Sequence, residues 1–74
     1  MKSRIELAVE LMHGADDWAE KSYELRQAAR LILSEMDALE LEAVARRLAD
    51  RGWTVSWLRV LIHGPEALQR DRRR

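Results

Sequence analysis

Apolar side chains recur every three or four positions along most of this chain, a spacing that places them on one face of an α-helix. Ser3 and Glu6 form a Ser-x-x-Glu capping box before the first such stretch. Gly14 is expected to end it, because glycine reaches the left-handed conformation without steric cost. The apolar face of this first predicted helix comprises Ile5, Ala8, Val9 and Met12.

A second helix is expected to begin at Asp16 or Asp17, where a carboxylate can accept hydrogen bonds from the free N–H groups of a first turn. Glu20, three residues after Asp17, completes a variant capping box. Its long apolar face is typical of a helix packed between neighbours, which predicts the central helix of the fold. That face comprises Trp18, Leu25, Ala29, Ile32 and Met36, widened by Ala28, Leu31 and Leu33.

Two further helices follow. Asp37 and Glu40 supply the capping box of the third, which Gly52 is expected to end, and its buried face would be Leu41, Val44, Ala45 and Leu48. Thr54 or Ser56 can cap a fourth helix that runs to His63, where Gly64 and Pro65 close it. Pro65 can start one last turn through Leu68. The pattern predicts an all-α fold, a compact bundle of four short helices.

Length and composition limit the chain to one domain. With 74 residues, a single hydrophobic core supplies only about 3–5 kcal/mol of net stability. The chain has no cysteine, which favours a reducing compartment, and no stretch approaches the roughly 20 apolar residues of a membrane span. We expect a single helical domain over residues 1–69 and a disordered basic tail over 70–74, in the cytoplasm. Arginine supplies 11 of the 13 basic residues, which favours a GC-rich bacterial source.

Residues 41–63 resemble a helix-turn-helix. In that family an alanine in the first helix allows the second to approach closely, a glycine shapes the turn, and a Val-Ser pair leads into the recognition helix. Ala45, Gly52, Val55 and Ser56 stand at those places here. The resemblance implies a pair of packed helices in the C-terminal half and a role in transcription regulation.

Two kinds of partner are open for this unit. If it binds DNA, the candidate contacts are its basic and hydroxyl side chains together with the tail: Arg46, Arg47, Arg51, Ser56, Arg59, Arg70, Arg72, Arg73 and Arg74. The distribution of charge is mixed, since the chain is neutral overall but carries most of its acidic residues between Asp16 and Glu42. Such an acidic surface repels phosphate backbones.

The alternative partner is a protein. Between Ser56 and Gly64 only Arg59 and His63 are polar, so this helix is apolar on all sides and a part of it needs cover. Tryptophan and arginine often anchor interfaces, although a tryptophan in so small a chain can equally fill the core. We expect a small regulatory protein that binds a regulator or a second copy of itself through Trp53, Trp57, Leu58, Arg59, Leu61 and Ile62.

Residues that carry out chemistry are sparse. His13 and His63 stand fifty positions apart, each just before a glycine, and one histidine with Glu10 falls short of a metal site. A helix-capping role is the simpler interpretation for both. No serine is paired with a positioned base, and no glycine-rich phosphate loop is present. We therefore expect no enzymatic activity, no cofactor, no metal and no small-molecule substrate.

Overall fold

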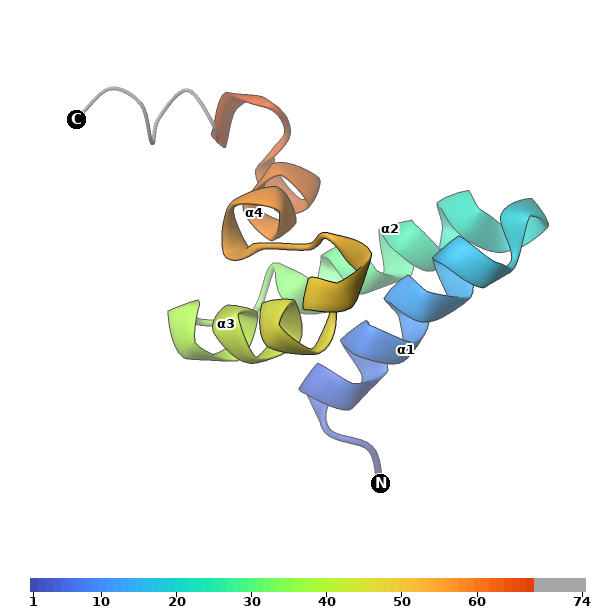
Figure 1. Ribbon diagram of the computed structural model, residues 1–74, viewed down its shortest axis with the longest axis horizontal. Coiled ribbons are helices and arrows are strands. Elements are labelled where there is room, and N and C mark those ends of the chain that lie inside the picture. The colour runs from blue at the N-terminus through green and yellow to red at the C-terminus, as the bar shows by residue number, and fades with distance from the viewer. Residues whose placement is uncertain (68–74) are drawn as a thin grey trace.

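The computed structural model describes residues 1–67, which fold into four α-helices (Figure 1). Helix α1 spans Arg4–Asp17, α2 spans Ser22–Leu33, α3 spans Ala38–Arg47 and α4 spans Val55–His63. Two short 3-10 turns, η1 at Ala19–Lys21 and η2 at Ala49–Arg51, precede α2 and follow α3. Since the described part of the chain contains no strand, the predicted all-α bundle is confirmed.

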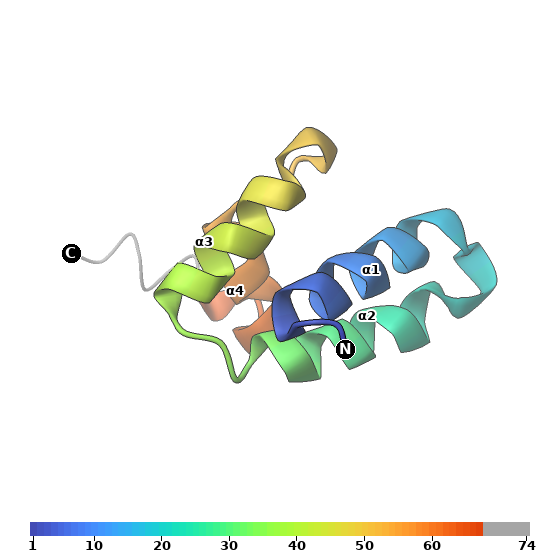
Figure 2. The ribbon, with the colours of Figure 1, turned by 90° about the horizontal axis from the view of Figure 1, so that it is seen from below.

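Helices α1 and α2 lie side by side as a hairpin (Figures 1 and 2). Helix α1 begins as predicted, with the Ser3 hydroxyl accepting a hydrogen bond from the Glu6 N–H at 3.2 Å. The prediction that Gly14 ends it is wrong, because the helix continues to Asp17. A Cβ atom at Gly14 would lie 3.2 Å from Cδ1 of Leu25 in α2. Gly14 therefore lies inside α1, facing the Leu25 side chain of α2, and does not stop the helix.

The predicted start of the second helix at Asp16 or Asp17 is also wrong. Both residues belong to the last turn of α1, and the N–H of Trp18 donates to the Gly14 carbonyl at 2.8 Å to close that turn. The C-terminal end of a helix carries partial negative charge, which disfavours carboxylates. Asp16 and Asp17 therefore require compensating cations, and the fold supplies them.

The ends of α3 and α4 follow the cap chemistry. Asp37 and Glu40 form the predicted capping box, with the Asp37 carboxylate accepting from the Glu40 N–H at 2.8 Å. Helix α3 ends at Arg47, short of the predicted Gly52, and η2 continues the chain to Gly52, whose φ of 85° is left-handed. Of the two predicted caps of α4, Thr54 is the one used: its hydroxyl accepts from the Trp57 N–H at 3.2 Å.

One hydrophobic core draws on all four helices. Helix α2 packs against α1 and against α4, while α3 contacts α1 and α4, as the crossing of the helices in Figure 2 illustrates. The predicted apolar face of α3 is buried in this core, as are Ala8, Val9 and Met12 of α1. None of the helices over residues 1–67 has both the length and the apolar character needed to cross a bilayer.

The end of the chain is described only in part. After Gly64, whose φ of 89° closes α4 as predicted, the Ala67 N–H donates to the Gly64 carbonyl at 3.1 Å. The rest of the predicted last turn, at Leu68, and the predicted tail at 70–74 lie outside the described residues. The predicted domain boundary at residue 69 falls there too.

Candidate protein interface

Helix α4 contributes one of its faces to the core. Leu58 is fully buried and Ile62 is 8% exposed, one turn apart on the side that faces the other helices. The Arg30 side chain of α2 holds the end of this helix, since its Nε donates to the Ile62 carbonyl at 3.3 Å. The sequence placed both apolar residues in the interface, and that prediction is wrong for them because both side chains are buried against the other helices.

Trp57, in contrast to Leu58 and Ile62, is exposed as the interface prediction requires. Its side chain is 50% exposed in the first turn of α4, although tryptophan has more apolar surface to lose than almost any other residue. Beside it lies an open apolar depression of about 200 Å³ lined by Gly52, Trp53 and Trp57, which we call the tryptophan notch. The left-handed turn at Gly52 and the Thr54 cap fix the backbone on either side of Trp53 and so form this depression.

The remaining predicted interface residues divide between two flanks of α4. Leu61 follows Trp57 by four positions, so it lies on the same flank and extends the apolar surface while packing partly on the core. Arg59 follows Trp57 by only two positions, which turns it to the other flank. The structure therefore brings Trp53 and Trp57 together at the notch, places Leu61 on the same flank of α4 as Trp57, and turns Arg59 to the other flank.

Trp53 is half-buried against the core and is covered on one side by a cation. The guanidinium carbon of Arg26, from α2, lies 5.9 Å from the centre of the Trp53 ring. This is the distance range of a cation–π contact. Trp53 thus has its ring fixed by both the core and a charged side chain, whereas Trp57 protrudes.

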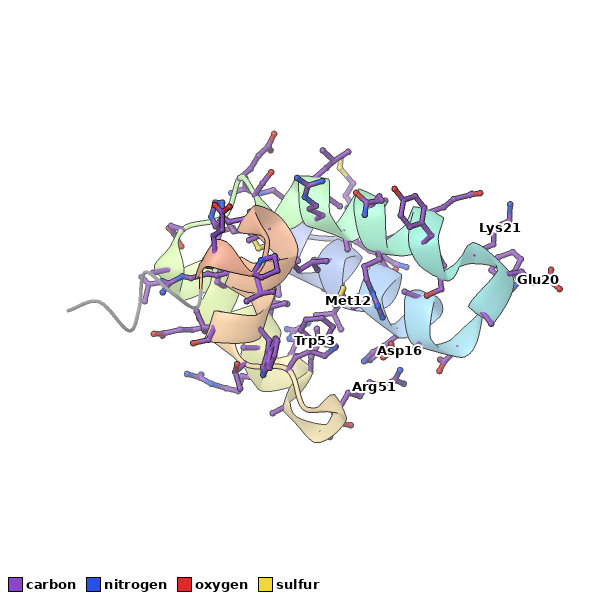
Figure 3. All side chains as sticks on the ribbon, turned by 90° about the horizontal axis from the view of Figure 1, so that it is seen from above. Met12, Asp16, Glu20, Lys21, Arg51 and Trp53 are labelled. Carbon is purple, nitrogen blue, oxygen red and sulfur yellow. The ribbon has the colours of Figure 1, made fainter. Side chains whose placement is uncertain are left out.

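Asp16 links three segments of the chain near Trp53. Its carboxylate accepts hydrogen bonds from Nη2 of Arg26 and from Nη1 of Arg51, both at 3.1 Å, and Arg51 also reaches Asp17 at 3.4 Å. Figure 3 shows Asp16 and Arg51 pointing toward one another beside Trp53, with Glu20 and Lys21 away at the tip of the hairpin. The hydrogen bond that Arg51 donates to Asp16, together with the charge of Asp17, raises the pKa of Arg51 and so favours its charged form.

The predicted DNA contacts have different surroundings. Arg51 is already engaged by Asp16 and Asp17, so its guanidinium is not a free phosphate ligand. Arg46 and Arg47 are exposed in the last turn of α3 and form no ion pair within residues 1–67, and Ser56 is exposed in the first turn of α4. Arg59 is half-buried in α4. The last four candidates lie beyond the described residues: Arg70, Arg72, Arg73 and Arg74.

Sequence reasoning missed several exposed apolar side chains. Leu31 was expected to widen the packed face of its helix, but it is 70% exposed. It stands two positions after the fully buried Ala29, which turns it to the far side of α2. Counting from Ala29 and Leu33 would have placed it correctly. Tyr23 of α2, Leu39 of α3 and Trp18 after α1 are also exposed.

Within residues 1–67, no three histidine, aspartate or glutamate side chains are grouped so as to hold a metal ion. No family model matches the chain, and neither a curated protein nor a solved structure matches it. The resemblance of residues 41–63 to a helix-turn-helix therefore stays a prediction, and function has to be argued from the surface alone.

Proposed function

We propose that this protein has no enzymatic activity and acts by binding another protein through the tryptophan notch, with Leu61 extending the contact surface. The observation that carries the proposal is the half-exposed Trp57 beside an apolar depression. Tryptophan is one of the residue types enriched among the few side chains that dominate binding energy in protein interfaces.

The size of the notch favours a side chain over a free small molecule. Sites for drug-sized ligands typically enclose about 300–1,000 Å³. The notch, at about 200 Å³, is smaller and open on one side. A single large apolar side chain projecting from a partner would fill it and would cover Trp57 at the same time.

The mechanism we propose is occupancy. A regulator docks on the tryptophan notch and is thereby blocked or recruited, and burial of Trp57 supplies the main gain in free energy. The absence of cysteine from the sequence supports placing this activity in the cytoplasm. A second copy of the chain is the other candidate occupant, and the oligomeric state decides between the two.

Affinity capture tests the proposal with one substitution in the notch and one control substitution away from it. Trp57→Asp places a charge in the notch, whereas Leu31→Asp places the same charge on the exposed far side of α2. A partner retained by the wild type and by Leu31→Asp, but lost by Trp57→Asp, is the expected result. Retention of that partner by Trp57→Asp would refute the role of the notch. Sedimentation of the purified chain at increasing protein concentration tells whether the occupant is a second copy. A mass that rises with concentration means that the chain associates with itself.

DNA binding is the second candidate function, and the exposed pair Arg46 and Arg47 favours it. Both are free of carboxylate partners among the described residues, so their charge is available to phosphates. Binding of a labelled duplex that weakens steeply with salt, and that decreases on Arg46→Gln with Arg47→Gln, would support this function. Equal binding by the wild type and the double variant would remove these arginines from any DNA interface.

A further inference from the structure

Two arginines from different elements converge on Asp16, and both bear on the position of Trp53. Arg26 of α2 donates to one carboxylate oxygen and Arg51 of η2 to the other, each at 3.1 Å. Asp16 belongs to the last turn of α1, where the partial negative charge of the helix end makes an unpaired carboxylate unfavourable. The contacts therefore relieve an electrostatic cost that the fold itself creates.

Arg26 is held from two sides. Its Nη2 is bonded to Asp16, while its guanidinium carbon lies 5.9 Å from the centre of the Trp53 ring. The Nε atom of the same group is buried and has no hydrogen-bond partner. Asp16 is thus the group that fixes the guanidinium over the ring, because Nε contributes nothing to its orientation.

Arg51 acts on Trp53 through the backbone. It ends η2 and stands two residues before Trp53, with only Gly52 between them. Backbone hydrogen bonds close this turn, from the Gly52 N–H to the Ala49 carbonyl at 3.0 Å and from the Trp53 N–H to the Leu48 carbonyl at 3.2 Å, and the Arg51 side chain ties the turn to Asp16. By bonding Arg51, Asp16 holds the start of this turn against α1.

We propose that Asp16 positions Trp53, and with it the tryptophan notch, and that ionic strength regulates the notch by weakening these ion pairs. The side chains of Asp16, Arg26 and Arg51 are between 31% and 37% exposed, so dissolved ions reach them. Screening grows strongly with salt, since the Debye length falls from about 10 Å at about 0.1 M to about 3 Å at about 1 M. Only the binding role of the notch rests on the proposed function.

The test measures the accessibility of Trp53 without any partner. Trp18→Phe and Trp57→Phe leave Trp53 as the sole tryptophan of the full chain. Quenching by acrylamide, which is uncharged, then reports exposure of this ring. We expect the quenching constant to rise about twofold between about 0.05 M and about 1 M sodium chloride, the scale set by loss of exposed ion pairs.

Asp16→Asn and Asp50→Asn separate the ion pairs from general charge effects. In this background Asp16→Asn should give high quenching already at low salt and no further rise. Asp50 is exposed beside Arg51 and forms no ion pair within residues 1–67, so Asp50→Asn should respond to salt as the parent does. Low quenching of Asp16→Asn at low salt, with the parental salt response, overturns the proposal.

The single-tryptophan parent, which keeps Asp16, gives a second test. If Asp16→Asn loses its helical circular dichroism, that variant is unfolded and the salt response of the parent is the test. A quenching constant of the parent that salt leaves unchanged overturns the proposal. The expected rise with salt supports it. The outcome is independent of affinity capture, because no partner is present. If the notch binds no protein, the quenching result still stands. If the quenching experiment overturns the role of Asp16, the proposal that the notch binds a protein still stands.

Discussion

At the scale of single residues, Leu58 and Leu31 are the same side chain in opposite surroundings. Leu58 is fully buried in α4 and Leu31 is 70% exposed in α2. Leu58→Ala should lose about 2–5 kcal/mol, the cost of removing buried methyl groups and leaving a cavity. Leu31→Ala should change stability by less than about 0.5 kcal/mol. Urea denaturation followed by far-ultraviolet circular dichroism measures both, and similar losses for the two variants would contradict the burial of Leu58.

The capping box of α3 gives a second prediction at this scale. Asp37→Ala removes the acceptor that bonds the Glu40 N–H at 2.8 Å, and should cost about 0.5–2 kcal/mol. Asp37→Asn keeps a side-chain oxygen at the same place, so it should retain most of the stability. Thermal unfolding of the two variants is the measurement. Equal destabilisation by both would mean that the charge of Asp37, and not its cap hydrogen bond, supports the helix.

At the scale of secondary-structure elements, two glycines should respond in opposite directions to the same substitution. Gly14 is helical, and alanine there gains about 1 kcal/mol of helix propensity. The new Cβ would lie 3.2 Å from the terminal Cδ1 of half-buried Leu25, which can move aside, so Gly14→Ala should be slightly stabilising. Gly52→Ala should cost about 1–2 kcal/mol, since its φ of 85° is unfavourable for any side chain.

Urea denaturation of the two glycine variants separates these effects. Gly14→Val serves as a control, because a branched side chain at 3.2 Å from Leu25 has no room to fit and should destabilise the hairpin. A loss of stability in Gly14→Ala would show that Leu25 cannot yield. No loss in Gly52→Ala would contradict the left-handed turn before Trp53.

The same elements explain what sequence alone could predict. Cap chemistry is local, so Ser3 and Asp37 located the starts of α1 and α3 correctly, and Thr54 was one of the two caps predicted for α4. Gly14 was misassigned because glycine, although typical of a helix end, also occurs inside helices, and here α1 continues past it to Asp17. The network at Asp16 joins residues up to 35 positions apart, a proximity that no local pattern encodes. Of the residues predicted for a protein interface, Trp53 and Trp57 line the notch, whereas Leu58 and Ile62 fill the core.

At the scale of the whole molecule, the shared core predicts that the two helical pairs unfold together. The α1–α2 hairpin and the α3–α4 pair could separate only by exposing a single cluster to which every helix contributes. Small domains with one core usually unfold in a single cooperative step. The ion pairs from Asp16 to Arg26 and Arg51 add a link across the same boundary, because they join α1, α2 and η2.

Urea denaturation followed by two probes, one that reports on all helices and one that reports on a single turn, tests this cooperativity. Far-ultraviolet circular dichroism follows all helices, while the fluorescence of Trp53, as the sole tryptophan, follows the η2–α4 turn where it packs on the core. We expect coincident transitions with a slope of about 1 kcal/mol/M, at the low end for small proteins because little surface is exposed on unfolding. A Trp53 transition at distinctly lower urea would mean that the α3–α4 pair detaches first. The shared core would then be too weak to couple the pairs, and the notch would belong to a separately unfolding unit.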